Sequence, residues 1–458
     1  MWLRVFLAIP LCLVIAASSH AQEWNRFRGR NGSGVSDATA IPESWTADDY
    51  RWQVELPGVG HSSPVIAGDR VYVTCADPTT AERRILCLNT ADGRKLWQRN
   101  YPSQTVAQHH DNGYATATPT ADHNGVVVTW ATAEAVTLLA LSPDGADMWQ
   151  RDLGPFVGPH GTGSSPILVH DVVVLANEQE DYKVLTRLMG REDPQGAAGT
   201  SFLIAVDRLT GTTRWQVPRK STLAPYATPC VRMLPDKKAE VIFSSTSHGV
   251  TAVDVATGQV NWELPDVFQD RCVGSPFVAG DTVFATYGHG TSGELCLAVR
   301  PGASGPEVLY EVKRGVPLVP TPLVADKRLY LWTDAGIVSC LDADTGRVIW
   351  QERVAGDFYG SPVFAAGRLY CIAKNGDVVV ISASDTFREL ARMPLGEPSF
   401  ATPAVADGVL YLRTASHLFA VGSRVRNRES SSQRCHSGAR KLVASSNVGL
   451  RRKSVCGL

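Results

Sequence analysis

Residues 340–350 read Cys-Leu-Asp-Ala-Asp-Thr-Gly-Arg-Val-Ile-Trp, in which an Asp-x-x-Thr-Gly turn is followed at a fixed distance by a tryptophan. The same spacing recurs at residues 205–215 and 252–262, and with polar exchanges at residues 87–97. A copy at residues 140–149 is one residue shorter. Recurrence at constant spacing indicates a structural repeat, in which Asp342 and Trp350 are a turn residue and a packing residue instead of a local catalytic device.

A second motif precedes these copies. It consists of Ser/Thr-Pro, an apolar pair, a Gly/Asp turn and an alternating apolar segment, as in Ser63-Pro64-Val-Ile-Ala-Gly-Asp-Arg-Val-Tyr-Val. Its prolines are Pro64, Pro119, Pro166, Pro229, Pro276, Pro322, Pro362 and Pro403, which lie 40 to 63 residues apart. A period of about 40–50 residues built only of strands and turns is typical of a β-propeller.

The pattern therefore predicts an all-β chain that forms an eight-bladed β-propeller with four-stranded antiparallel blades. Blade eight has only three strands before the pattern stops near Gly422, so we expect residues 50–54 to supply its outer strand and close the ring. Each turn Asp can accept backbone N–H groups, and each turn Gly can adopt positive φ. The outer-strand tryptophans are expected to wedge between blades: Trp52, Trp97, Trp149, Trp215, Trp262 and Trp350.

The two ends of the chain differ from the repeats. Residues 1–21 combine Arg4, an apolar run and a small-x-small site, which is typical of a signal peptide and predicts a periplasmic or secreted protein. Residues 22–44 form a lead-in to the propeller at residues 45–422, and no later segment is apolar enough to span a membrane. Residues 423–458 carry nine Lys/Arg and one acidic residue, and we expect a disordered basic tail, either a functional arm or a non-native extension.

Charge and cysteine usage exclude some functions. The net charge of −1 offers no strong field for nucleic acid, and we expect none as a partner. Cysteines such as Cys87, Cys296 and Cys340 lie in apolar strand-like runs, which predicts buried thiols and not a disulfide framework.

These repeats resemble the pyrroloquinoline quinone (PQQ) repeat propellers, whose tryptophan-docking motif is Ala-x-Asp-x-x-Thr-Gly-x-x-x-Trp. The resemblance covers about residues 45–422. It implies one of two branches. The first is the eight-bladed quinoprotein alcohol dehydrogenases, which hold PQQ and calcium. The second is the non-catalytic propellers similar to the BamB outer-membrane assembly factor, which bind protein partners and hold no PQQ.

The residues required for dehydrogenase chemistry are missing or scattered. The chain has no adjacent cysteine pair and no Cys-x-x-Cys-His haem site. Asn177, Glu178, Glu180 and Asp181 could supply calcium ligands, but we expect them to form a solvated acidic loop. We therefore expect a binding or scaffolding protein without a cofactor, catalytic residue or metal. The alternative is a PQQ-dependent dehydrogenase that oxidises a small alcohol or sugar with PQQ and calcium.

Three features are candidate binding sites. The positions three residues before each proline should open onto one face of the ring, and with their neighbours they predict a channel mouth, either a recognition pocket or a solvated channel. Its residues are His61, His110, Asn112, Tyr114, Thr116, His160, Tyr226, Arg271, Tyr359 and Phe400. The polar loops 101–115 and 177–200 could bind a protein or peptide partner of a monomer. His109 and His110 should point to opposite sides of an extended segment, so we expect His109-His110-Asp111 to be a polar inter-blade loop.

Overall fold

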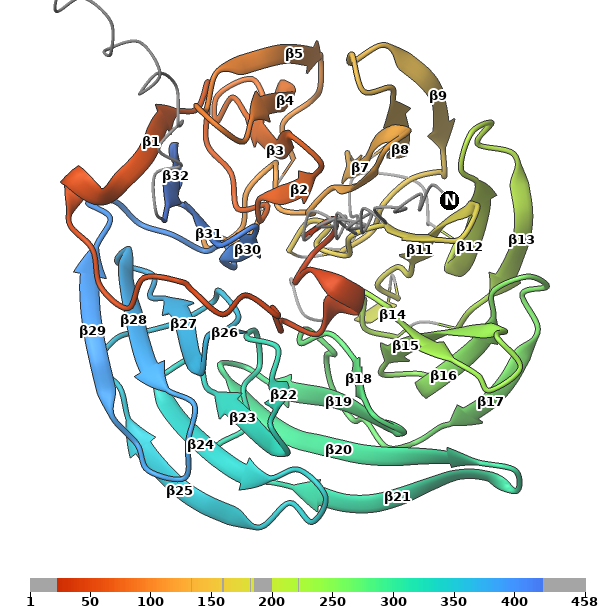
Figure 1. Cartoon of the computed structure of the whole chain (residues 1–458). Helices are drawn as coiled ribbons and strands as arrows, with labels where there is room; N and C mark the ends of the chain where they lie inside the picture. Colours follow the sequence, from red (N-terminus) through yellow and green to blue (C-terminus); the bar gives the residue numbers. More distant parts are fainter. Residues whose placement is uncertain are drawn as a thin grey trace, which may run out of the picture. The chain divides into compact units, whose positions relative to one another are not determined.

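In the described part of the chain, apolar residues form 32 short strands, which pair into eight four-stranded antiparallel sheets. Figure 1 shows the eight sheets arranged around a central channel. This computed structural model describes residues 23–422 except residues 107, 133, 159, 182, 185–199 and 221. The predicted eight-bladed propeller is therefore confirmed, whereas the predicted signal peptide and basic tail lie outside the described residues. No helix among the described residues is long and apolar enough to cross a bilayer.

The first four blades follow one another along the chain. Blade one contains β2 (Val65–Ala67), β3 (Arg70–Ala76), β4 (Arg83–Asn89) and β5 (Lys95–Tyr101). Blade two contains β6 (Thr120–Asp122), β7 (Gly125–Ala131), β8 (Val136–Leu141) and β9 (Asp147–Asp152). Blade three contains β10 (Ile167–Val169), β11 (Val172–Asn177), β12 (Phe202–Asp207) and β13 (Thr213–Pro218). Blade four contains β14 (Cys230–Met233), β15 (Ala239–Ser245), β16 (Gly249–Asp254) and β17 (Val260–Leu264).

The remaining blades complete the circle. Blade five contains β18 (Phe277–Ala279), β19 (Thr282–His289), β20 (Ser292–Gly302) and β21 (Gly305–Val312). Blade six contains β22 (Leu323–Ala325), β23 (Arg328–Trp332), β24 (Ile337–Asp342) and β25 (Val348–Arg353). Blade seven contains β26 (Val363–Ala365), β27 (Arg368–Ile372), β28 (Asp377–Ser382) and β29 (Glu389–Pro394). Blade eight contains β30 (Ala404–Ala406), β31 (Val409–Arg413), β32 (His417–Val421) and β1 (Tyr50–Glu55).

The ring closes through the N-terminal strand, as predicted. β1 pairs antiparallel with β32, and Trp52 lies opposite Ala420. The joint to blade one is reinforced by the fully buried Arg413, whose guanidinium donates to the Ser62 carbonyl at 2.8 Å. Closure leaves the propeller without an exposed edge between its first and last blades.

The Asp-x-x-Thr-Gly turn forms as its sequence predicts. In blade six, Asp342 Oδ1 accepts the backbone N–H of Thr345 at 2.9 Å and its hydroxyl at 2.7 Å. Gly346 has φ 71°, and a Cβ at this position would lie 2.4 Å from the Tyr310 ring of the preceding blade. Glycine is therefore required both for the turn conformation and for the close approach of an aromatic ring.

The tryptophans pack over the turns of the following blade. The Trp215 indole lies against Gly258, and its N–H donates to the Val255 carbonyl at 2.8 Å. Each equivalent bond runs from a Trp indole N–H to a turn carbonyl of the next blade: Trp52 to Thr90, Trp97 to Pro143, Trp149 to Arg208 and Trp350 to Ser384. The predicted wedge therefore has a polar component, because every such N–H finds an acceptor.

Trp262 in blade four and the equivalent position of blade five, Tyr310, depart from the predicted wedge. The indole N–H of Trp262 contacts Glu240 of its own blade at 3.4 Å. The reason is that blade five joins β20 to β21 by a hairpin that lacks the Asp-x-x-Thr-Gly turn. In blade five Tyr310 takes the tryptophan's place and donates to the Ala343 carbonyl at 2.6 Å. Trp350 docks on the next blade as predicted, but its ring is only partly buried, so it packs less apolar area than Trp215.

A closed ring of hydrogen bonds joins the innermost strands. The backbone N–H of each Ser or Thr that precedes a motif proline donates to the hydroxyl of the equivalent residue in the next blade. The eight bonds, between 2.9 and 3.2 Å, connect Ser63, Thr118, Ser165, Thr228, Ser275, Thr321, Ser361 and Thr402 and return to Ser63. Because all eight residues are buried, the ring satisfies groups that water does not reach.

The lead-in crosses the ring, which the sequence did not predict. Residues 23–49, red in Figure 1, run across the middle of the propeller and include η1 (Arg30–Gly32) and η2 (Ala47–Asp49). Trp24 pairs with Ile66 of blade one, and the buried Arg28 donates to the Pro322 carbonyl at 2.9 Å. Further along, the backbone of Ser36 donates to Phe364 of blade seven at 2.9 Å. The lead-in is therefore part of the propeller core.

The described cysteines agree with the prediction of buried thiols. All are free and buried: Cys75, Cys87, Cys230, Cys272, Cys296, Cys340 and Cys371. Burial raises the pKa of the Cys87 thiol to about 12. These thiols therefore stay protonated at neutral pH and behave as small apolar side chains.

We predict that Trp215→Ala lowers the free energy of unfolding by about 3–5 kcal/mol, because it removes a buried ring and leaves a cavity between blades three and four. Trp350→Ala should cost clearly less, because that ring is partly exposed. Urea denaturation of both variants measures the difference. An equal or larger loss in Trp350→Ala would contradict the relation between burial and docking strength.

Candidate functional site at the channel mouth

The inner loops enclose one large cavity at the mouth of the channel. Its volume is about 720 Å³. The eight positions three residues before the motif prolines all line it: His61, Thr116, Gly163, Tyr226, Val273, Val319, Tyr359 and Phe400. The eight residues of the Ser/Thr ring line it as well. The repeat therefore supplies both a uniform set of hydroxyls and a varied rim.

The structure brings together eight of the ten residues predicted at the mouth. Those that line the cavity are His61, Asn112, Thr116, His160, Tyr226, Arg271, Tyr359 and Phe400. The other two lie elsewhere. The side chain of His110 is mostly exposed, and the Tyr114 ring packs 4.9 Å from the Arg83 guanidinium. Ligand binding by these residues remains a prediction.

One wall of the cavity is aromatic. The Phe400 ring lies between His61 and Tyr359, with ring centroids 4.6 Å and 5.8 Å apart. The Lys374 ammonium sits 4.4 Å from the centroid of the Tyr359 ring. Aromatic faces with a few polar groups are the usual lining of a recognition pocket, because they bury ligand surface while fixing its orientation.

The loop of residues 102–115 is tied across the mouth by one carboxylate. Asp111 Oδ2 accepts the Tyr359 hydroxyl and the Lys374 ammonium of blade seven, each at 3.0 Å. Burial raises the pKa of Asp111, but hydrogen bonds from Lys374 and Tyr359 outweigh it and hold that pKa below its usual value. Asp111 is therefore ionised at neutral pH and connects blades that are distant in sequence.

Two cavity histidines are held neutral. Burial, with the nearby Arg413 charge, lowers the pKa of His61 to about 4. Burial, with the charge of Arg271, lowers the pKa of His160 to about 4. The His61 Nδ1 has no hydrogen-bond partner among the described residues. The cavity therefore presents uncharged polar atoms that a bound molecule could satisfy.

Among the described residues one arginine, Arg271, lines the cavity, and it is itself paired. Arg271 donates to both carboxylate oxygens of Glu180, at 2.7 and 2.8 Å, and the Glu180 side chain is fully buried. Glu180 Oε2 also accepts the backbone N–H of Ala224 at 2.8 Å. Such a bidentate pair fixes the guanidinium plane and neutralises most of its charge. Arg271 therefore acts as a positioned donor and not as a free cation.

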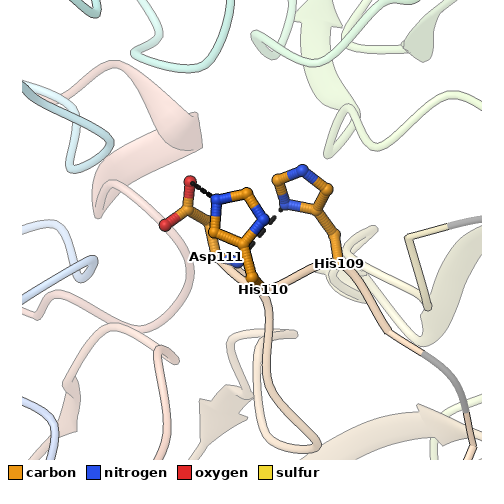
Figure 2. A group of neighbouring side chains, drawn as sticks. All are labelled: His109, His110 and Asp111. Carbon is orange, nitrogen blue, oxygen red and sulfur yellow. Dashed lines mark hydrogen bonds and ion pairs between the residues drawn. The ribbon is translucent and has the colours of Figure 1, made fainter.

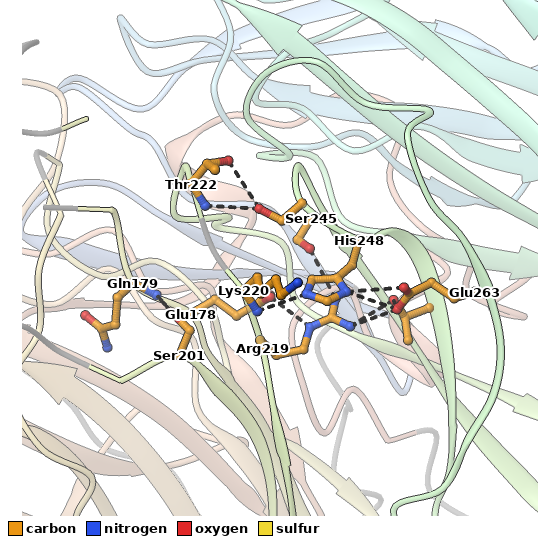
Figure 3. A network of polar contacts seen from close by, with 11 residues as sticks. Glu178, Gln179, Ser201, Arg219, Lys220, Thr222, Ser245, His248 and Glu263 are labelled. Carbon is orange, nitrogen blue, oxygen red and sulfur yellow. Dashed lines mark hydrogen bonds and ion pairs between the residues drawn. The ribbon is translucent and has the colours of Figure 1, made fainter. Parts of the chain in front are cut away.

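The predicted solvated acidic loop is wrong. Asn177, Glu178 and Glu180 are all buried. Figure 3 shows Glu178 beside Arg219. Glu178 Oε1 accepts Arg219 Nε at 3.0 Å, and both side chains are 1% exposed. Arg219 further donates to Ser245 and Thr251 of blade four, at 3.1 Å each. Residues 177–180 are thus anchored by buried ion pairs whose cations, Arg219 and Arg271, lie far along the sequence.

The predicted orientation of the two adjacent histidines, His109 and His110, is also wrong. Their rings do not point to opposite sides: the centroids lie 4.1 Å apart, because the chain turns at residues 110–111 instead of running extended (Figure 2). Donor atoms of His109, His110 and Asp111 all lie within 4.8 Å of one another. The loop is polar, as expected, but its side chains converge.

Sequence reasoning missed several cavity residues. Phe27 reaches the cavity from the lead-in, Asp270 from the connection between blades four and five, and His289 from the end of β19. Lys374 acts through Asp111, a pair separated by 263 residues. No local motif marks these residues, since each is defined by a partner from another blade.

The donor set of the cavity does not fit calcium-bound PQQ. Among the described residues two carboxylates line it, and each is paired through one oxygen: Asp111 Oδ2 with Lys374, and Asp270 Oδ2 with His289 at 2.5 Å. The acidic insert is committed to Arg219 and Arg271. A hard cation needs several free carboxylate and carbonyl oxygens in one place, and the described residues of the cavity do not provide them.

Comparison with known proteins identifies the family of this chain. The model of a PQQ-repeat family described as "Outer membrane protein assembly factor BamB" matches residues 44–200, 196–305 and 311–424. The chain belongs to this family. A relative named outer membrane protein assembly factor BamB, from Burkholderia pseudomallei (strain K96243), is 22% identical over 386 residues, which cover 82% of this chain and 86% of the relative.

Solved structures share the fold. The crystal structure of BamB from Moraxella catarrhalis matches with a TM-score of 0.55 and 14% identity, covering 81% of this chain and 97% of that one. A europium-containing methanol dehydrogenase matches with a TM-score of 0.62 and 11% identity, covering 88% and 98%. At such identities the likeness concerns the fold alone, which binding proteins and dehydrogenases share.

We predict that stability falls as the pH drops from about 6.5 to about 4 and that part of this fall depends on His61. The folded-state pKa of His61, about 4, is below its unfolded value. The unfolded chain therefore binds the proton first, and up to roughly 3 kcal/mol is lost across this range. Unfolding by urea at several pH values should give a shallower slope in His61→Gln. His123→Gln, at an exposed turn, should show the same dependence of the free energy of unfolding on pH as the parent. Equal slopes in the parent and both variants would refute the assignment of this pH dependence to His61.

We predict that Arg219→Ala lowers the free energy of unfolding by about 3–5 kcal/mol, because it leaves the buried Glu178 without its cation. Arg214→Ala is the matched control: its side chain is 46% exposed, its partners are Asp171 and Asp207, and its cost should stay within about 1 kcal/mol. Chemical denaturation compares the two. Similar losses would mean that the insert is not anchored through Arg219.

Proposed function

We propose that this protein is a non-catalytic propeller that binds a protein partner through its channel-mouth face and acts as a scaffold in outer-membrane assembly. The family, described by an outer membrane assembly factor, supports this role. The observation that carries the proposal is the rim of the cavity. Eight positions that the repeat would allow to be alike vary in size, polarity and aromatic character, as a recognition surface requires.

The face around the cavity has the composition of a binding site. Tyr226, Tyr359 and Phe400 supply aromatic anchors, and the described residues of loop 102–115 supply histidine and amide groups. Aromatic and arginine side chains dominate binding energy in protein interfaces because they bury large areas at low entropic cost. We propose that a partner segment inserts an apolar side chain against the Tyr359–Phe400 wall.

The quinoprotein alternative finds less support. We propose that the chain works without bound PQQ or calcium, because Asp111 and Asp270 are each paired through one oxygen and Glu180 is held by Arg271, which leaves too few free oxygens for a calcium site. We also propose a periplasmic location for a monomer, in line with the family. The expected signal peptide would direct the chain there.

A crosslinking experiment tests the proposal. A photo-reactive residue at Thr116 or Val319, both at the rim, should capture one discrete envelope protein in cells, and that yield should fall about tenfold or more when Tyr359 and Phe400 are replaced by Ala. The same probe at Leu209, an exposed turn residue on the outer edge, should capture none. Equal capture from Leu209, or an unchanged yield in the double variant, would exclude the mouth as the binding face.

A separate measurement addresses the alternative. Purified protein is incubated with PQQ and calcium, and both the quinone absorbance and dye-linked oxidation of small alcohols and sugars are followed. We expect neither saturable binding nor activity. Saturable PQQ binding that is lost in Tyr226→Ala would overturn the scaffold proposal in favour of the dehydrogenase.

A further inference from the structure

Imidazole groups from two separate segments converge beside the cavity. His109 and His110 lie on the 102–115 loop, and His160 lies on the segment between blades two and three. The His109 and His160 rings meet edge to face, with centroids 5.1 Å apart, and the His109 and His110 centroids are 4.1 Å apart. The Asp111 carboxylate completes the group, with its ligand atom within 4.8 Å of those of both loop histidines (Figure 2).

We propose that His109, His110 and Asp111, together with His160 from the neighbouring segment, form a binding site for one divalent transition cation of the zinc type. Imidazole and carboxylate are the preferred donors of such ions, and tetrahedral coordination draws four donors to about 2 Å from the metal. The donors of the loop are already close enough that small side-chain rotations would bring them to this distance. This site is independent of the proposed partner.

The surroundings hold these ligands as a metal site requires. Asp111 is oriented by Tyr359 and Lys374, and the contacts among the described residues all go to Oδ2, so that Oδ1 faces no competing donor. The Asn112 amide donates to the His160 carbonyl and therefore ties the two ligand-bearing segments together. Hydrogen-bonded carboxylates and fixed ligand backbones are typical of the outer shell of metal centres.

The location explains what a cation would do. His109, Asp111 and His160 all line the cavity, so a bound ion would present its remaining coordination positions to a ligand or to a partner side chain. It would also join the 102–115 loop to the segment that carries His160. Metal binding should therefore protect that loop as well as change the charge of the mouth.

Zinc titration of the untagged protein by calorimetry or against a chromophoric chelator tests the site. We expect one Zn²⁺ per chain, with affinity weakened at least tenfold in His109→Ala and in His160→Ala. His123→Ala removes an exposed histidine of the β6–β7 turn and should bind as the parent does. Co²⁺ should give the visible spectrum of a low-symmetry, four-coordinate ion.

Each result decides the proposal. Absence of stoichiometric Zn²⁺ binding, or parent affinity in His160→Ala, would overturn it, because the site is defined by the two segments together. Limited proteolysis gives a second readout that does not depend on affinity: Zn²⁺ should slow cleavage within residues 102–115 in the parent and not in His160→Ala. Partner crosslinking from Thr116 is scored separately, so failure of the metal site and failure of the binding role are distinguishable.

Discussion

The closed circle of eight Ser/Thr hydrogen bonds is the constraint on which the rest of the structure depends. A residue before proline is confined to extended backbone, so its N–H points sideways out of the strand. Here that N–H is buried and can be satisfied only by the next blade, through hydroxyls such as Thr118 for Ser63. A cycle of such bonds closes only when each blade adds the same rotation. It therefore fixes the starts of all innermost strands at one level around the channel.

Because of this circle, packing and recognition fall to different positions of each repeat. The residue immediately before each proline is always Ser or Thr, because it must both donate an N–H and offer a hydroxyl. Two residues earlier the chain has left the strand and meets no such demand, so Gly163 and Tyr226 can occupy equivalent positions side by side. The repeat thus builds a rim whose chemistry is free to differ in every blade. This freedom is what makes a recognition role consistent with so regular a fold.

The fold and the rim positions could be predicted from the sequence because local, periodic motifs encode both. Asp342, Gly346 and Trp350 are recognisable within eleven residues, and a proline three positions on marks each rim residue. The ion pairs could not be found this way. Glu180 and Arg271 are 91 residues apart, so the acidic insert looks solvated until the ring brings its cations beside it. The convergence of His109 and His110 was missed for a different reason, since a single turn of the backbone overrides the alternation expected of an extended segment.

The lead-in determines which end of the channel is open. It crosses the channel at the end opposite the rim, where it meets the innermost strands of blades one, four and seven, and places Phe27 at the cavity floor. Arg26 and Arg28 flank Phe27 and are buried without a carboxylate partner among the described residues; burial lowers their pKa to about 10 and about 9, so both remain charged at neutral pH. Uncompensated buried charge is costly, and here the carbonyl groups of Pro229 and Pro322 offset part of that cost. The lead-in fills this end of the channel, so the cavity opens toward the rim, beside the loop that Asp111 ties to blade seven.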